Sequence, residues 1–300
     1  MSVPVVFLVF NRPEKTARVF DAIRRVAPAR LHVVCDGPRA GVTGEIDRVL
    51  ETRRIATSVD WPCDLTTDFS ETNLGCRHRV SSGLSGAFER FDRAIILEDD
   101  CLPDPSFFPF CEEMLDRYAS AEHVMHIGGT NFLSGWAQTP VESYYFSRLF
   151  HIWGWATWRR AWRHYDVTMQ AWPAFKQTRG LRAALPDRDM RGFWSRTFDL
   201  SHRRAIDSWD HQWSFACLRA EGLAVIPSVN LVANIGFDGQ GTHTESHHHN
   251  PAPHSAPLPF PLRHPAAITW NREADRYVQR RNFPRRFGML QDWIDILRGV

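Results

Sequence analysis

Three short apolar runs in the first hundred residues set the hydrophobic pattern of the chain. They are Val3–Phe10, Leu31–Cys35 and Arg93–Leu97, and each is dense in aliphatic or aromatic side chains. Continuous runs of this length, without polar alternation, are typical of strands that are buried on both faces of a parallel sheet. We therefore predict three central strands here.

Residues at helical spacing fill the intervals between these runs. Apolar positions in Glu14–Val26 recur on one face, and further helices are predicted at about 43–57 and 77–91. A polar stretch between the last two leaves room for one more strand. This alternation of strands and helices predicts an α/β fold with a mostly parallel central sheet, flanked by helices on right-handed crossovers.

Polar residues follow directly where each predicted strand ends. Asn11-Arg12, Asp36-Gly37 and Glu98-Asp99-Asp100 come after the first, second and third run. In open α/β sheets, ligands bind beyond the carboxyl ends of the strands. We expect these three segments to converge on one crevice.

The rest of the chain is more irregular. A helix is predicted from about 105 to 118, short strands and aromatic helices at 125–200, a helix at about 210–221 and a strand at 224–227. The segment 236–261 is rich in Gly, His, Asn and Pro, which predicts a long flexible loop. A basic, aromatic tail follows.

Composition narrows the class of protein. With 300 residues, 43% of them hydrophobic, the chain can bury a full core. Its formal net charge is +2, from 36 basic and 34 acidic residues. This near-balance argues against a nucleic-acid partner, because such proteins carry a strong basic excess.

Cysteines and hydropathy indicate the compartment. The six cysteines show neither a C-x-x-C pair nor regular spacing, which argues against a zinc site and a disulfide framework. No signal-peptide pattern is present at the N-terminus, and no run of roughly 18 apolar residues occurs. We therefore expect a cytoplasmic protein with reduced thiols.

The Glu98-Asp99-Asp100 triplet is the strongest chemical signal in the sequence. Three adjacent carboxylates at the end of an apolar strand repel one another, and a bound divalent cation would offset that repulsion. Carboxylate oxygens suit Mg²⁺ or Mn²⁺, and Mg²⁺ also takes phosphate oxygens as ligands. The simpler interpretation is a solvated acidic turn that caps the next helix.

Several motifs together resemble a known family. VVFLVFNRP, HVVCDGPR, RHRVSSGLSGAF and AIILEDDCLPDPSFFPF are followed in order by GWATWRRAW, SWDHQW and IPSVNLVANIGFDGQGTHT. They are similar to the inverting GT-A glycosyltransferases of the N-acetylglucosaminyltransferase I type, over about residues 3–245. The resemblance implies a GT-A domain at 1–245, with a nucleotide-binding half at 1–103 and an acceptor half at 104–245. Residues 246–300 would form a flexible loop and a small, basic C-terminal extension.

The resemblance assigns roles to the triplet. It makes Asp100 the direct ligand of Mn²⁺ or Mg²⁺, and it places Glu98 and Asp99 against the ribose or the donor sugar. It also implies a UDP-sugar as donor.

The same resemblance assigns three further nucleotide contacts. Asp36 would bind the uracil or ribose, His78 would lie against the base, and Arg12 would lie near the nucleotide. Each residue has an ordinary alternative. Asp36 can form a turn before Gly37, His78 can be an exposed helix residue, and Arg12 can be a surface cation.

An inverting transfer needs a general base beside the acceptor hydroxyl. The family carries this base in a W-D-D-W stretch before a helix, which matches Asp210 better than Asp207. His211 stands where the family has its second acidic residue, so the match remains ambiguous. The alternative for Asp210 is a capping role at the following helix.

The glycine-rich segment around Gly239–His243 offers a closing loop. There, His243 would approach the diphosphate or the metal when the donor is bound. Three consecutive histidines, His247–His249, cannot all face one ion in a regular element. A solvated loop is therefore favoured over a dedicated metal site.

Two features bear on the acceptor. Gly154-Trp155 and the aromatic residues around it would form an acceptor wall or pack against the sheet; both remain open. The Arg-rich end would touch anionic lipid or form a solvated basic face, and the second is favoured. The arginines are Arg276, Arg280, Arg281, Arg285 and Arg286.

The acidic triplet and the family resemblance together predict a metal-dependent glycosyltransferase, and the resemblance implies that it is inverting. It would move a sugar, with N-acetylglucosamine as a candidate, from a UDP-sugar to a hydroxyl of a glycan or lipid-linked acceptor. A sugar nucleotidyltransferase is the nearest rival, but Asn11-Arg12-Pro13 lacks the glycines of a triphosphate-binding loop. A non-catalytic glycan- or nucleotide-binding module is the second rival.

Overall fold

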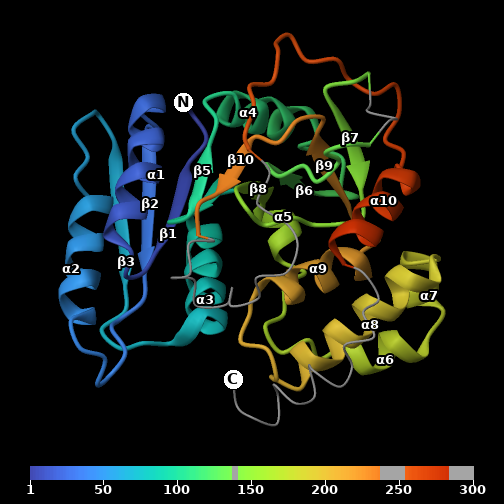
Figure 1. The fold of residues 1–300 in the computed structure, drawn as a ribbon, viewed down its shortest axis with the longest axis horizontal. Helices are drawn as coiled ribbons and strands as arrows, with labels where there is room; N and C mark the ends of the chain where they lie inside the picture. The colour runs from blue at the N-terminus through green and yellow to red at the C-terminus, as the bar shows by residue number, and fades with distance from the viewer. Residues whose placement is uncertain (137–140, 237–253, 284–300) are drawn as a thin grey trace.

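The computed structural model describes residues 1–136, 141–236 and 254–283, which form an α/β fold around one large sheet (Figure 1). The eight strands of this sheet lie in the order β3-β2-β1-β4-β8-β6-β9-β7, and a two-stranded sheet joins β10 to β5. The strands are β1 (Val5–Val9), β2 (Arg30–Cys35), β3 (Asp64–Phe69), β4 (Arg93–Glu98), β5 (Cys101–Pro103), β6 (Val124–Gly128), β7 (Tyr144–Ser147), β8 (Trp155–Trp158), β9 (Leu223–Pro227) and β10 (Val232–Asn234). The helices are α1 (Pro13–Val26), α2 (Glu45–Ala56), α3 (Gly75–Arg90), α4 (Phe107–Arg117), α5 (Arg159–Trp162), α6 (Trp172–Gln177), α7 (Gly180–Ala184), α8 (Arg188–His202), α9 (Asp210–Arg219) and α10 (Arg272–Asn282).

Most of the described sheet is parallel, as the sequence predicts. The strands β3, β2, β1 and β4 pair in parallel, and so do β6 and β9. The exceptions are β8, which runs antiparallel between β4 and β6, and β7, which runs antiparallel at the edge. The pairing of β8 joins the two groups of parallel strands into one continuous sheet.

Burial of β1 on both faces explains its unbroken apolar sequence. Val5, Phe7 and Val9 pack into one hydrophobic cluster, and Val6 and Leu8 pack into the other. The first cluster lies against α1, α2 and α4, and the second against α3, α5, α8 and α9. Figure 1 shows α1 and α2 beside β1–β3 in the blue part of the chain, and α6–α9 grouped away from them.

An aromatic part of the second cluster lies between β6, β8 and α9. Trp155 is fully buried and stacks on the His126 ring, with centroids 5.2 Å apart. The indole N–H of Trp213 donates to His126 Nδ1 at 3.1 Å, so the other nitrogen, Nε2, carries the proton that is donated to the carbonyl of His151 at 3.0 Å. Of the two roles left open for Trp155, the structure shows packing in the core.

Residues 254–283 pack against the body of the protein. Leu258 and Leu262 are buried in the cluster that contains α4. At the start of α10, the carboxylate of Asp275 is fully buried and accepts hydrogen bonds from Ser147 Oγ at 2.5 Å and from the backbone N–H of Arg148 at 2.7 Å. Residues 246–253 and 284–300 lie outside the described residues, so the predicted division into a domain and an extension stays a prediction.

Two further observations concern the whole of the described chain. All six cysteines are described, and all are free thiols. Among the described residues, no helix has both the length and the apolar character needed to cross a membrane.

Candidate active site

A cavity of about 370 Å³ opens at the carboxyl ends of β1, β2 and β4. The strand ends supply Phe10, Asp36 and the triplet 98–100, while Cys76 and Arg79 of α3 form the facing wall. The predicted convergence of the three polar segments is therefore present. Its position matches the general location of ligand sites in open α/β sheets.

The acidic triplet occupies the turn between β4 and β5. Glu98 is the last residue of β4, and Asp99 and Asp100 follow it. Arg12, just before α1, contacts both aspartates through one nitrogen: its Nη1 lies 3.3 Å from Asp99 Oδ1 and 2.9 Å from Asp100 Oδ2. The backbone N–H of Phe10 also donates to Asp99 Oδ2 at 3.3 Å.

Arg12 compensates only part of the negative charge of the triplet. Burial and the charge of Asp100 raise the pKa of Asp99 to about 7, against the opposing effect of Arg12. Burial and the three neighbouring aspartates, Asp100 first, raise the pKa of Glu98 well above its ordinary value. Glu98 Oε1 is buried and finds no hydrogen-bond partner among the described residues. The triplet is thus poorly compensated, and added positive charge would stabilise it.

The donor atoms of the triplet fit a hard divalent cation. They are carboxylate oxygens, and Glu98 Oε1 has its hydrogen-bonding capacity unused. Within the described ranges, no three His, Cys, Asp or Glu side chains form a ready-made metal cluster. Mg²⁺ usually takes only one or two protein carboxylates together with waters and phosphates, so a preformed cluster is not required.

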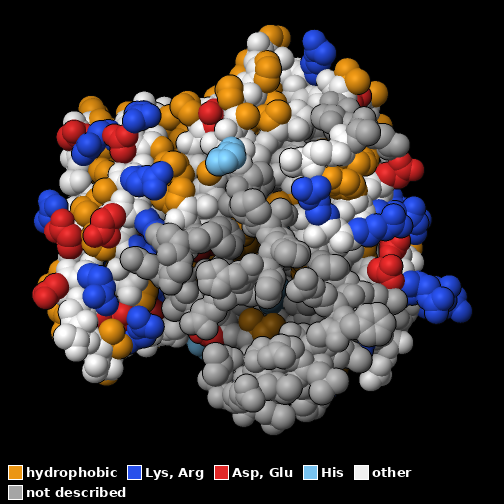
Figure 2. Space-filling model, viewed as in Figure 1, with side chains coloured by type: hydrophobic (Ala, Val, Ile, Leu, Met, Phe, Trp, Pro, Cys, Tyr) orange, Lys and Arg blue, Asp and Glu red, His pale blue; other side chains and the backbone are white. Residues whose placement is uncertain are grey.

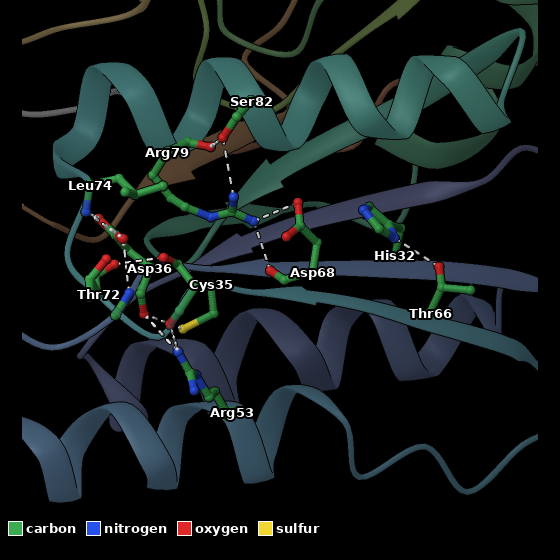
Figure 3. Close-up of polar contacts among 12 residues, drawn as sticks. His32, Cys35, Asp36, Arg53, Thr66, Asp68, Thr72, Leu74, Arg79 and Ser82 are labelled. Carbon is green, nitrogen blue, oxygen red and sulfur yellow. Dashed lines mark hydrogen bonds and ion pairs between the residues drawn. The ribbon is translucent and has the colours of Figure 1, made fainter.

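Asp36 ties the end of β2 to the start of α3 (Figure 3). Its carboxylate accepts the backbone N–H groups of Gly37 at 2.8 Å, Leu74 at 2.9 Å and Gly75 at 3.0 Å. Asn73 Nδ2 donates to it as well, at 3.2 Å. Asp36 therefore satisfies the first amides of α3, a role that no side chain of that helix's own N-cap performs.

The same wall is held by two arginines that reach toward the sheet (Figure 3). Arg79 of α3 pairs with Asp68 of β3 at 2.7 Å. From α2, Arg53 donates to the carbonyl of Ser70 at 2.6 Å and to that of Asp36 at 3.2 Å. These contacts fix the wall of the cavity that the end of β2 and the start of α3 form.

Gly37 is required for this close packing. A Cβ at that position would lie 2.5–2.7 Å from three backbone atoms of Thr72. Gly37 thus allows the end of β2 to approach the segment before α3 closely, and Asp36 beside it lines the cavity.

Of the two candidate bases, Asp207 is among the residues that line the cavity and Asp210 is not. The side chain of Asp207 is 56% exposed. The buried Arg77 holds this segment, because it donates to the carbonyl of Ile206 and its Nε lies 3.8 Å from Asp207 Oδ1.

Asp210 is the first residue of α9 and is not among the residues that line the cavity. Its charge contributes to the raised pKa of both Glu98 and Cys76, after larger contributions from burial and from other carboxylates. The side chain makes no N-cap hydrogen bond, because Trp209 occupies the cap position. The capping interpretation of Asp210 is therefore not what the structure shows.

Of the two predicted histidines, only His78 is among the described residues, and it does not line the cavity. His78 is exposed on α3, while its neighbours Arg77 and Arg79 are buried. His243 lies outside the described residues, as do His247–His249. The roles predicted for these residues stay predictions.

Sequence reasoning missed several residues that line the cavity. Gly236 follows β10 and lies against the triplet: a Cβ there would collide with Asp100 Oδ2. The backbone N–H of Gly236 donates to Asn234 Oδ1 at 2.7 Å, and both residues line the cavity. The motif NIGFDGQG contains both, yet only the pairing of β10 with β5 brings them to Asp100. Arg39, Asn73, Cys76 and Ile152 are further lining residues that the sequence does not predict, whereas Trp153 is one of the aromatic residues around Gly154-Trp155 for which the sequence leaves a wall role open.

No protein-family profile and no curated protein sequence matches this chain. Solved structures that resemble part of this chain include residues 1–349 of S. aureus TarS, which is 10% identical with a TM-score of 0.40, over 77% of this chain and 59% of that one. Another is the galactosyltransferase LgtC in complex with donor and acceptor sugar analogues, 14% identical with a TM-score of 0.34, over 58% of this chain and 64% of that one. Mouse xyloside xylosyltransferase 1 in its apo form is 11% identical with a TM-score of 0.35, over 74% of this chain and 82% of that one. At these identities and TM-scores, the comparisons assign no activity to this chain.

Proposed function

We propose that this protein is a metal-dependent, inverting glycosyltransferase of the GT-A type. The donor is a UDP-sugar, with UDP-N-acetylglucosamine as the first candidate, and the acceptor is a hydroxyl of a glycan or lipid-linked glycan. One observation carries the proposal: a poorly compensated acidic triplet, with the unpartnered Glu98 Oε1, lies in a cavity at the strand ends. A divalent cation with a diphosphate would complete this charge distribution.

Each part of the cavity then has a role. Asp100 would hold Mn²⁺ or Mg²⁺, whose charge, when the ion is bound, stabilises the diphosphate that leaves the sugar. The nucleoside would lie toward the wall of Asp36 and Arg79. Because the Asp36 carboxylate already accepts several backbone and side-chain donors, its main contribution is to keep that wall in place. Arg12, between the wall and the triplet, would lie beside the diphosphate.

Asp210 is the proposed general base. Its side chain is 30% exposed, and its charge contributes to the raised pKa of Glu98 after burial, Asp100 and Asp99. A base at this point would take the proton of the acceptor hydroxyl as the new glycosidic bond forms, and it need not hold a free alkoxide. Asp207, nearer the opening of the cavity, is the alternative. The cytoplasmic location stays a prediction.

The test is calorimetric titration of UDP- and GDP-sugars with Mn²⁺ and with EDTA, followed by an assay for sugar transfer or donor hydrolysis. We expect one UDP-sugar to bind only with Mn²⁺, and Asp100→Asn to abolish that binding. Asp60→Asn is the matched control, because Asp60 is 63% exposed and pairs only with Arg24 among the contacts described. Failure of every nucleotide-sugar to bind a folded protein would overturn the proposal.

The assay also separates the enzyme from a binding module. A module would bind its ligand without Mn²⁺, and it would show no turnover that depends on Asp210.

A further inference from the structure

A second cavity lies on the surface between α10 and the segment that ends at Trp136. It has a volume of about 480 Å³ and is lined by Trp136, Glu273, Arg276, Tyr277, Arg280 and Arg281. None of these residues lines the first cavity. We refer to it as the α10 groove.

Aromatic rings form one side of the α10 groove. The Trp136 and Tyr277 rings lie 6.1 Å apart at an angle of 38°. The Tyr277 ring is held because its hydroxyl donates to the carbonyl of Ser134 at 2.8 Å, and the turn that presents Trp136 is closed by its backbone N–H, which donates to the carbonyl of Leu133 at 2.8 Å. Held aromatic faces of this kind offer apolar area at little cost in side-chain entropy.

Positive charge forms the other side. Three arginines face one glutamate, and Figure 2 shows basic side chains gathered over α10 at the right of the molecule. Arg276 is paired with Asp187 at 3.1 Å. Arg280 and Arg281 are exposed, and Arg281 Nη1 donates to the Tyr277 hydroxyl at 3.1 Å. The planar guanidinium groups suit carboxylate, sulfate or phosphate groups, which they can bind through two hydrogen bonds.

One short segment connects the α10 groove to the candidate active site. The Phe132 ring packs on Trp153, with centroids 5.5 Å apart, and Trp153 lines the first cavity. Four residues further on, Trp136 lines the α10 groove. The Cα atoms of residues 132 and 136 can be at most roughly 14 Å apart, because an extended chain advances no more than about 3.6 Å per residue.

We propose that the α10 groove is a binding site for a glycan that carries anionic groups, and that this glycan is the acceptor. The aromatic rings contact the C–H faces of its sugars, and Arg280 and Arg281 bind its anionic groups. The identification as acceptor rests on the proposed function, whereas the binding itself needs neither donor nor metal. A membrane surface would also attract arginines, but it does not require a groove with aromatic rings.

The experiment measures binding to the full chain without nucleotide or Mn²⁺. The probes are a heparin-derived hexasaccharide, maltohexaose as its neutral counterpart, and vesicles that contain phosphatidylserine. The variants are Arg280→Ser/Arg281→Ser and, as a control with the same change in charge, Arg24→Ser/Arg25→Ser on α1, where both arginines are largely exposed. Trp136→Leu tests the aromatic side.

We expect the wild type to prefer the sulfated hexasaccharide over maltohexaose. We also expect the Arg280/Arg281 variant to lose roughly tenfold or more in affinity, and the Arg24/Arg25 variant to change by less than about twofold. Trp136→Leu should weaken binding without a change in net charge. Equal losses in both double variants would show non-specific attraction and overturn the proposal, and binding of vesicles but not of the hexasaccharide would do the same.

Asp100→Asn separates this proposal from the proposed function. That variant should bind the hexasaccharide as the wild type does, even though it binds no donor. If the groove binds the anionic glycan but no sugar is ever transferred, the site stands and only its role as acceptor site fails.

Discussion

Arg12 Nη1 lies 2.9 Å from Asp100 Oδ2, the oxygen of the residue predicted to bind the metal. The same nitrogen also contacts Asp99, so one guanidinium partly compensates two carboxylates. A divalent cation would therefore enter a site that already has a positive neighbour. Without a nucleotide, Arg12 and the cation would compete for the carboxylates of Asp99 and Asp100. A bound diphosphate would add negative charge that can interact with both of them.

This relationship predicts opposite effects of Arg12→Gln on two ligands. Without nucleotide, Mn²⁺ should bind about tenfold more tightly, because a repelling charge within contact distance is removed. With Mn²⁺ present, UDP should bind more weakly, because its diphosphate loses a cationic neighbour. Titration calorimetry of each ligand measures both, with Arg24→Gln as the surface control. Weaker Mn²⁺ binding by Arg12→Gln would show that Arg12 organises the carboxylates and does not compete.

Gly236→Ala should remove metal-dependent donor binding while the protein stays folded. The new methyl group would collide with Asp100 Oδ2, so that carboxylate must turn away. Gly86→Ala is the matched control, because a Cβ at Gly86 in α3 meets nothing within 4 Å. It should be neutral or stabilise the helix by about 0.5–1 kcal/mol. Donor binding is measured by calorimetry and stability by urea unfolding. Normal UDP-sugar binding by Gly236→Ala would exclude Asp100 as the ligand.

The two candidate bases are distinguished by turnover at saturating donor. Asp210→Asn should lower kcat by roughly 10²-fold or more and leave donor affinity unchanged, because only the acceptance of the proton is lost. Asp207→Asn should have a much smaller effect on kcat, since its carboxylate lies at the opening beside Arg77. The reverse order of effects would move the base to Asp207.

Acid should destabilise the protein through His126. Burial lowers the pKa of His126 to about 3, whereas an unfolded histidine has a pKa of about 6.5. Between these values the unfolded chain binds the proton and the folded one does not, so stability falls as the pH drops below about 6.5. The loss at pH 5 amounts to about 2 kcal/mol relative to neutral pH. Burial also lowers the pKa of His151, to about 4, which acts in the same direction.

The check is urea unfolding at pH 7.5 and pH 5 for wild type and His126→Gln. The glutamine can still accept from Trp213 but does not titrate, so the difference between the two pH values should shrink by about 2 kcal/mol. An unchanged difference would assign the pH dependence to other groups.

The sequence predicts the elements whose signal is local. The run Val3–Phe10 forms β1 because both faces of that strand are buried, which leaves no polar alternation. In contrast, β3 is only partly buried at the edge of the sheet, and its sequence DLTTDF carries too few apolar residues to stand out. The four-residue strand β8, WATW, reads equally well as part of an aromatic helix. Its pairing with β4 and β6 decides the matter, and that pairing is not visible in the sequence.

The residues of the candidate site also divide into those with a local sequence signal and those placed by long-range contacts. The triplet and Asp36 end recognisable strands, so their convergence can be predicted. The residues of α3 that face the cavity are set by the point at which the helix begins. That point is fixed by Asp36, which accepts the backbone N–H of Leu74 although it lies 38 residues earlier in the sequence. A local reading therefore cannot tell exposed His78 from buried Arg79. Gly236 reaches Asp100 only through β10, which no local pattern marks.

The pairing of β8 with β4 has a consequence for work with fragments. A piece that ends after Pro103 would keep β1–β5 but lose β8, which pairs with residues 93–96. The freed border of β4 would present the apolar Ile95 and Ile96 next to unpaired backbone groups, and such a border recruits strands of other molecules. We expect the isolated fragment 1–103, the predicted nucleotide-binding half, to precipitate as intermolecular β-structure when it is expressed alone. Ligand screening should therefore use protein that retains at least the chain through β9.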